Sequence, residues 1–141
     1  MIQDKQARIF LVDDHRIVRL GFRTVLEELG HFEVAGEAGS GEEALEGISR
    51  ATPDLAVVDI AMRGMDGIEL TRALKREHPN VHVLIVSMHD DTYYVERALE
   101  AGADGYLLKD NADALMVDAV ERILEGKQYL CGDIQGKIGR S

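Results

Sequence analysis

The sequence predicts an α/β fold in which five βα units wind around one parallel sheet. Two observations indicate this class. Short apolar runs alternate with amphipathic stretches five times along the chain, as expected where helices cover a parallel sheet. Most of these runs are almost continuously apolar, which is typical of strands buried on both faces. The length of 141 residues suits one ordinary domain and leaves no comfortable room for two.

The predicted strands are short blocks rich in valine, isoleucine and leucine. They cover residues 9–12, 32–38, 55–58, 81–86 and 105–108. The second block alternates apolar and polar residues more than the others do. We therefore expect it at an edge of the sheet, where one side is less covered.

Residues at helical spacing predict a helix after each strand. The first helix, over about 18–29, should end at Gly30, and Ser40 should cap the second because Glu43 follows as in a capping box. The third should end at His78, since a residue before proline avoids helical geometry. The last three helices are expected at about 68–77, 92–101 and 112–125. The domain is thus predicted over 8–125, between an extension at 1–7 and a glycine-bearing linker or truncated tail at 126–141.

Composition excludes several classes of function. The chain carries 16 basic and 26 acidic residues, a formal net charge of −10, so it repels polyphosphate backbones and is not expected to bind DNA alone. No apolar run approaches the ~18 residues that would cross a membrane. The single cysteine, Cys131, and a start without an export signal favour the reducing cytoplasm.

Polar side chains follow four of the five predicted strands. Asp13 and Asp14 follow the first strand, Asp59 the third, Ser87 the fourth and Lys109 the fifth. Each aspartate or the serine, taken alone, could be a helix cap or turn residue, and the lysine a surface charge. Parallel strands end at one rim, where ligands of such sheets bind. Joint convergence on that rim favours a functional site.

Three carboxylates held close together need a cation, because like charges repel. Oxygen ligands favour Mg²⁺, which commonly keeps waters and phosphate oxygens as its other ligands. Asp59, on the central strand, is a plausible nucleophile for phosphoryl transfer. That reaction needs mainly positioning and charge neutralisation, which a metal and Lys109 would supply, while Ser87 could donate to a third oxygen.

At these residues the sequence resembles the response-regulator receiver family. The similarity covers about 8–125, and it rests on Asp13-Asp14, the run Asp-Ile-Ala-Met-Arg-Gly-Met-Asp-Gly at 59–67, Val86-Ser87, and Gly-Ala-Asp-Gly-Tyr-Leu-Leu-Lys at 102–109. The residues at 87–90 and 105–110 are similar to those of the NarL/LuxR-type branch of this family. The resemblance implies a flavodoxin-like (βα)5 fold, a doubly wound parallel sheet with strand order 2-1-3-4-5.

The resemblance also implies roles for individual residues. Asp59 would be the phosphoacceptor, and Mg²⁺ would be held by Asp14, Asp59 and the backbone carbonyl of Ala61. Asp13 would act through a water molecule on the metal, and Lys109 would contact the phosphoryl group. Ser87 and Tyr106 would form the switch. Ala61 and His89 would tune the phosphoryl lifetime. Phosphorylation would draw Ser87 toward the phosphoryl oxygens and let Tyr106 turn inward.

The implied partners are a sensor histidine kinase and a carboxyl-terminal LuxR-type helix-turn-helix DNA-binding domain of the same protein. Homodimerisation on phosphorylation would be possible. Such a domain is no enzyme beyond its own phosphorylation and dephosphorylation.

Two positions depart from the family pattern. Arg63 replaces the usual proline four residues after the acceptor, which leaves the loop less fixed in φ and adds a charge near the pocket. Asp110 follows the lysine where many relatives have a proline after a cis bond. A cis bond before a non-proline residue costs about 2.5–4 kcal/mol, so a trans peptide is predicted.

Three alternative functions stay open at this point. A phosphatase or phosphotransferase of the haloacid dehalogenase kind also phosphorylates an aspartate beside Mg²⁺, but its nucleophile usually follows the first strand in an Asp-x-Asp arrangement. A flavodoxin-like small-molecule binder is disfavoured, because no glycine-rich phosphate loop follows a strand. A stand-alone receiver is the third. His15 and His89 lack a cysteine or a paired histidine, so we expect neither to bind a metal.

Overall fold

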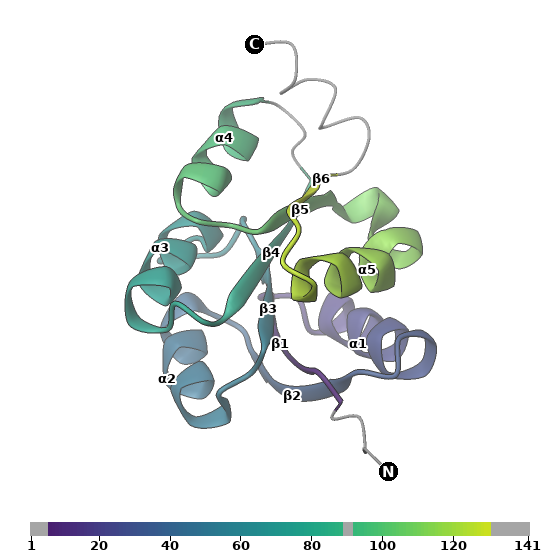
Figure 1. Cartoon of the computed structure of the whole chain (residues 1–141). Coiled ribbons are helices and arrows are strands. Elements are labelled where there is room, and N and C mark those ends of the chain that lie inside the picture. The colour runs from purple at the N-terminus through teal and green to yellow at the C-terminus, as the bar shows by residue number, and fades with distance from the viewer. Residues whose placement is uncertain (1–5, 89–91, 131–141) are drawn as a thin grey trace.

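The computed structural model describes residues 6–88 and 92–130, and they form a single parallel sheet covered by helices (Figure 1). The sheet order is β2-β1-β3-β4-β5-β6, and all neighbouring strands pair in parallel. The predicted order of the first five strands is confirmed, with β2 at an edge. The strands are β1 Arg8–Val12, β2 Glu33–Ala38, β3 Leu55–Asp59, β4 His82–Ser87, β5 Gly105–Leu108 and β6 Tyr129–Leu130.

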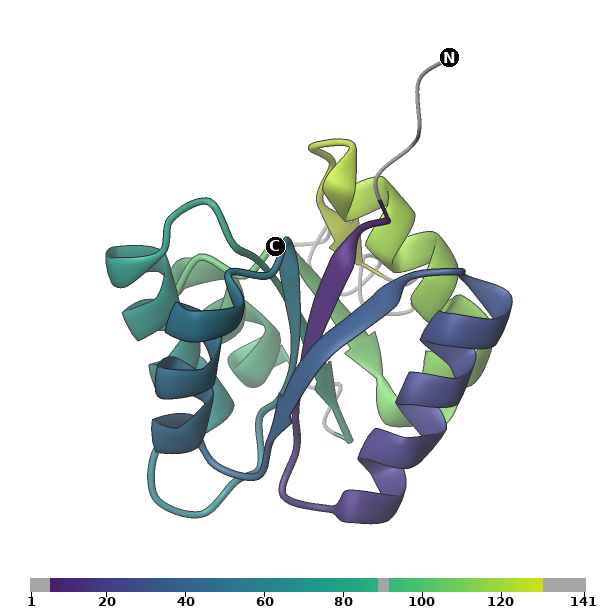
Figure 2. The ribbon, with the colours of Figure 1, turned by 90° about the horizontal axis from the view of Figure 1, so that it is seen from below.

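The helices form one layer on each face of the sheet. Figure 2 shows α1 and α5 on one face, and α2, α3 and α4 on the other. The helical segments are α1 Arg16–Thr24, the π-helical η1 Val25–Leu29, α2 Gly41–Ala51, α3 Gly67–Glu77, α4 Thr92–Glu100 and α5 Lys109–Leu124. This doubly wound arrangement buries the central strands on both sides.

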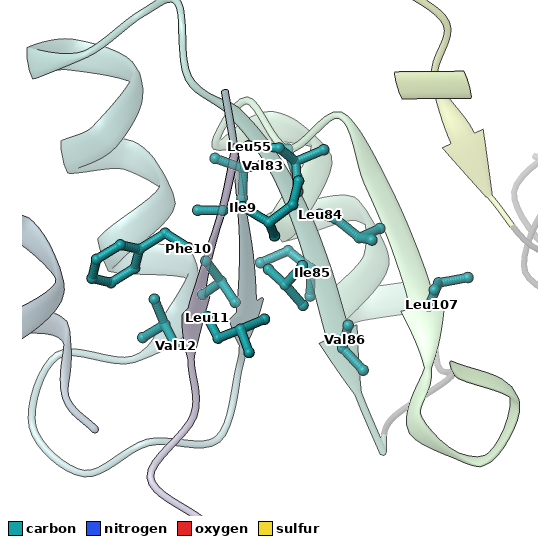
Figure 3. Packing of buried hydrophobic residues seen from close by; sticks show 14 of the residues in the cluster. Ile9, Phe10, Leu11, Val12, Leu55, Val83, Leu84, Ile85, Val86 and Leu107 are labelled. Carbon is teal, nitrogen blue, oxygen red and sulfur yellow. The ribbon is translucent and has the colours of Figure 1, made fainter. Parts of the chain in front are cut away.

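The core lies along the three central strands. Every residue of β3 is buried, as are all but the first residue of β1 and of β4. Figure 3 shows buried side chains of β1 and β4, together with Leu55 of β3 and Leu107 of β5, projecting from the sheet. Because these strands are fixed by dense packing, the residues that directly follow them have well-defined positions.

The ends of the first three helices follow local signals in the sequence. The first helix passes into a π turn at Val25 and ends at Gly30 as predicted, with the Gly30 N–H donating to the Val25 carbonyl at 3.2 Å. The Glu43 N–H donates to Ser40 Oγ at 3.2 Å, which confirms the predicted cap of α2. The Glu43 carboxylate accepts from the N–H of Gly39, one residue before the cap. Helix α3 ends at Glu77, with His78 as its cap.

Most boundaries lie within two residues of the prediction, and two features differ further. Helix α5 begins at Lys109, three residues before the predicted start, because its first residues are polar and carry no helical periodicity. Strand β6 pairs Tyr129 with Gly105 and Leu130 with Tyr106, inside the segment that we predicted to be a linker. A strand of two residues is too short to give a periodic pattern.

No helix within 6–88 and 92–130 is long and apolar enough to cross a membrane. The described peptide bonds include no cis bond, so the trans peptide predicted between Lys109 and Asp110 is confirmed.

The first residue of α3, Gly67, lies directly against the end of β3. A Cβ atom at this position would stand 2.3 Å from the Asp59 carbonyl oxygen and 2.8 Å from Ile60 Cα. The Gly67 N–H also donates to the Ile60 carbonyl at 3.0 Å. The loop that follows Asp59 is thereby folded back tightly onto the strand that carries it.

Gly67→Ala is expected to lower the free energy of unfolding by about 2–3 kcal/mol, because the methyl group would meet backbone atoms that cannot move aside. Gly21→Ala is the control, since a Cβ atom at Gly21 in α1 meets nothing within 4 Å. Alanine is a better helix former, so the control should gain up to about 1 kcal/mol. Urea unfolding of both variants measures the difference. A Gly67→Ala protein as stable as Gly21→Ala would contradict the close approach.

Candidate functional site

The aspartate, serine and lysine side chains selected from the sequence lie together at the carboxyl ends of the strands. Asp13 follows β1, Asp59 ends the adjacent strand β3, and Lys109 begins α5 directly after β5. Lys109 Nζ lies 3.1 Å from Asp13 Oδ2 and 3.4 Å from Asp59 Oδ1. One ammonium group therefore bridges two carboxylates that are far apart in the sequence.

The two bridged carboxylates are buried and incompletely satisfied. Asp13 and Asp59 are 2% and 3% exposed. Asp59 Oδ1 accepts from the N–H of Ala61 at 3.3 Å. Within the part of the chain that the structure describes, neither Asp13 Oδ2 nor Asp59 Oδ2 accepts a hydrogen bond, because Lys109 approaches Asp13 Oδ2 in a direction unsuited to one. Buried carboxylate oxygens normally have such a partner. Among the described residues, Asp13 Oδ2 has only the ion pair with Lys109, and Asp59 Oδ2 has neither a hydrogen bond nor an ion pair, so Asp59 Oδ2 is available to a ligand or cation.

The carboxyl group of Asp59 has an unusual protonation equilibrium. Burial, and then repulsion by Asp13, raise its pKa from 3.8 to about 6, although Lys109 acts in the opposite direction. In the metal-free protein, burial and the charge of Asp13 therefore disfavour the ionised form of this carboxylate. A strongly perturbed carboxyl at the rim of a sheet is typical of a functional site.

This raised pKa predicts how stability depends on pH. Because the pKa of Asp59 is higher in the folded than in the unfolded chain, its stabilising contribution is complete below about pH 4 and is lost as the pH rises through about 6. In metal-free buffer at pH 7.5, Asp59→Asn should therefore exceed wild type in free energy of unfolding by about 2 kcal/mol. The excess should shrink toward pH 4.5.

Urea unfolding at the two pH values, in EDTA, measures this excess. Asp118→Asn is the matched control, because the Asp118 side chain on α5 is exposed, and its substitution should change stability little at either pH. An Asp59→Asn protein no more stable than wild type at pH 7.5 would show that burial does not raise the pKa of Asp59.

His15 belongs to the site, although the sequence alone gave it no role there. Its Nδ1 atom lies 3.1 Å from Asp13 Oδ1 and 3.0 Å from Asp14 Oδ1, and its backbone N–H donates to Asp13 Oδ1 at 2.8 Å. The imidazole thus lies against both acids of the pair. Its place directly after Asp14 was the available signal, but only the turn after β1 reveals the contact.

The donor set fits a divalent cation. One ligand atom from each of Asp13, Asp14, His15 and Asp59 lies within 4.8 Å of the others. The set is dominated by carboxylate oxygens, which suit Mg²⁺, and two of the buried oxygens lack a hydrogen bond. Since a single lysine cannot neutralise three carboxylates, a bound cation would relieve both their repulsion and their desolvation.

The two residues predicted to form the switch are both buried at neighbouring strand ends. Ser87 ends β4 and is 1% exposed, and it pairs in register with Leu108, the residue before Lys109. Tyr106 is fully buried in β5. His89, predicted to tune the phosphoryl lifetime, lies outside the described residues.

An open pocket of about 460 Å³ adjoins the acidic cluster. Its walls come from the loops after β1, β2 and β3. They comprise Asp14, His15, Gly39, Ser40 and Arg63. Because Asp14 belongs to both the pocket and the acidic cluster, a molecule in the pocket would lie beside the carboxylates.

Comparison with known proteins identifies the arrangement. Residues 9–121 match the family model described as the response regulator receiver domain. The chain is 38% identical over 130 residues to the transcriptional regulatory protein DegU of Brevibacillus brevis, covering 92% of this chain and 55% of the relative. It is 37% identical to the response regulator GacA of Pseudomonas viridiflava, covering 93% of this chain and 61% of the relative. The chain therefore spans a little over half the length of these relatives.

A solved structure agrees with the sequence relatives. The LuxR-family two-component response regulator from Aurantimonas sp. SI85-9A1 superimposes with a TM-score of 0.91 at 38% sequence identity. The match covers 96% of this chain and 97% of that structure.

Proposed function

The chain belongs to the family of response regulator receiver domains, and from this premise we propose that Asp59 is its phosphoacceptor. One observation carries the proposal: Asp59 is a buried carboxylate of raised pKa, bridged by Lys109 to a second buried carboxylate, Asp13. This equipment suits phosphoryl transfer, which needs positioning and charge neutralisation more than acid–base chemistry.

The two oxygens of Asp59 would have different tasks. Oδ1 is held by the Ala61 N–H and by Lys109, whereas Oδ2 accepts no hydrogen bond from the described residues. Oδ2 would therefore attack phosphorus, and the electron pair of the broken bond would depart with the leaving group. Lys109 would stay beside the new acyl phosphate and neutralise part of its charge.

Mg²⁺ would be held by Asp14, Asp59 and the backbone carbonyl of Ala61, with Asp13 acting through a water molecule on the metal. When bound, it would neutralise negative charge on the phosphoryl oxygens. Ser87 would contact the phosphoryl group from the end of β4, and Tyr106 would form the second part of the switch. His89 and Ala61 would tune how long the phosphoryl group persists.

The partners follow from the family and from the length of the relatives. We place a sensor histidine kinase as phosphoryl donor, and the cytoplasm as the location. The relatives named as regulators are longer than this chain. A DNA-binding domain joined to the receiver after β6 would convert phosphorylation into transcriptional control. The receiver, which begins at about residue 8 and includes β6, would dimerise on phosphorylation and would turn over no external substrate.

The test is incubation of the chain with acetyl phosphate and Mg²⁺, followed by intact-mass analysis. One labile phosphoryl group per chain is expected, and EDTA should prevent it. Release of p-nitrophenol from p-nitrophenyl phosphate, measured in parallel, should stay at the level of the buffer. Sustained turnover of that phosphomonoester would instead favour the phosphatase alternative.

A further inference from the structure

Arg63 offers a positive charge to the pocket beside the acidic cluster. It is exposed, and it makes no hydrogen bond or ion pair with any other residue in 6–88 or 92–130. A guanidinium group is always charged and carries five N–H donors. In a chain with a net charge of −10, which repels anions, a cation at the edge of this pocket has a disproportionate influence on which anions enter.

The loop that carries Arg63 is held at both ends. A Cβ atom at Gly41 would lie 2.8 Å from Met65 Sδ, so Met65 packs directly on the start of α2. Gly67 packs as closely on the carbonyl of Asp59. The loop without its usual proline is therefore anchored by two glycine contacts, and these keep Arg63 next to Ser40 and Asp14 in the pocket wall.

The position of Arg63 separates it from the group that is transferred. Lys109 forms an ion pair with Asp59 and would stay beside the phosphoryl group as it bonds to the carboxylate. Arg63 forms no ion pair with Asp13 or Asp59. In an in-line displacement, the leaving group departs on the side of phosphorus opposite to the attacking oxygen. That side faces away from the buried carboxylate. The pocket that Arg63 lines adjoins Asp14 of the acidic cluster and offers open space for the leaving group.

We propose that Arg63 is a specificity-determining residue, which favours small-molecule phosphoryl donors whose leaving group departs as a carboxylate. The inference rests on the proposed function, because it concerns the donor for Asp59. With an acyl phosphate, an Asp59 oxygen forms the bond to phosphorus, the phosphorus–oxygen bond to the acyl group breaks, and its electron pair leaves on that oxygen. Arg63 neutralises the resulting carboxylate.

The rate of phosphorylation by a donor with a neutral leaving group is not expected to depend on Arg63. In phosphoramidate the nitrogen already carries its proton, so the phosphorus–nitrogen bond breaks to give neutral ammonia. No anion develops on the side of the pocket. The two donors deliver the same phosphoryl group to the same carboxylate. The ratio of the two phosphorylation rates therefore reports on the leaving group alone, because the metal, Lys109 and Asp59 act equally on both donors.

The experiment compares initial rates of phosphorylation by acetyl phosphate and by phosphoramidate, both with saturating Mg²⁺, by intact-mass analysis. Arg63→Gln should slow the reaction with acetyl phosphate about fivefold, the size expected for one solvated charge contact, and should change the rate with phosphoramidate less than twofold. Arg63→Lys should recover part of the loss. Arg72→Gln, which removes an exposed arginine of α3 outside this pocket, should behave as wild type with both donors.

The outcomes separate the two proposals. A fivefold loss confined to acetyl phosphate, which diminishes at high salt, supports the role of Arg63. Equal losses with both donors would show that Arg63 acts on the loop or the metal, and unchanged rates would show that it contacts no donor, so either result overturns the inference while the proposed function stands. Failure of wild type to react with either donor would overturn both.

Discussion

Replacing Asp59 by asparagine is expected to abolish phosphorylation of the chain by acetyl phosphate and Mg²⁺. The amide lacks the anionic oxygen that attacks phosphorus, and it removes one of the carboxylates that would hold the metal. Intact-mass analysis should show one phosphoryl group on wild type and none on Asp59→Asn. The loss should be complete if Asp59 is the acceptor, because an amide side chain cannot form the acyl phosphate.

The control for this substitution must preserve the fold and must remove one negative charge, as Asp59→Asn does. Asp118→Asn meets both needs, since it removes one carboxylate from the exposed side of α5. It should be labelled as wild type is. If Asp59→Asn were labelled to the same extent, then another group would be the acceptor, and the assignment of Asp59 would be wrong.

Asp14→Ala is expected to weaken Mg²⁺ binding by at least about tenfold, because changes even to the partners behind metal ligands cost about 10–100-fold. Metal-dependent phosphorylation should fall with it. Loss of the Asp14 side chain should disturb the fold little. It is more exposed than Asp13 or Asp59, and its contact among the described residues is with His15 Nδ1, 3.0 Å away. Calorimetric titration with MgCl₂ measures the affinity directly.

Asp13→Ala and Asp118→Ala complete this series. Asp13→Ala should do less direct damage to metal binding, but it leaves Lys109 with Asp59 alone. Asp118→Ala should bind Mg²⁺ as wild type does. Unchanged Mg²⁺ affinity in Asp14→Ala would mean that the acidic pair serves the fold and not the metal.

The parts of the site that could be predicted are those fixed by buried strands. Because β1, β3 and β4 are continuous apolar blocks, their ends could be located to within a residue, and side chains that follow parallel strands must share one rim. Asp13, Asp59 and Lys109 meet there as expected. The pattern of apolar residues is enough to locate these strand ends, because strands buried on both faces can pair in only one register.

The remaining features depend on contacts that periodicity does not encode. The approach of His15 to both acids depends on the turn after β1, and the oxygens without hydrogen bonds depend on the direction from which Lys109 arrives. The Tyr129–Leu130 strand depends on the free edge of β5. Each is decided by tertiary geometry over one or two residues, a scale at which local preferences are readily overridden.

The start of helix α5 lies at a position for which its own sequence is poorly suited. Leu108 provides no side-chain cap, and Lys109 places a cation where the helix dipole is positive, an arrangement that disfavours the first turn. Asp110 in the first turn of α5 offsets part of this cost, and Asp13 and Asp59 offset part of it from outside the helix. The stability of the first turn of α5 therefore depends in part on the charge of two residues at the ends of other strands, Asp13 and Asp59. Phosphorylation of Asp59 would change one of these charges, and it would thereby alter the stability of the first turn of α5 through Lys109.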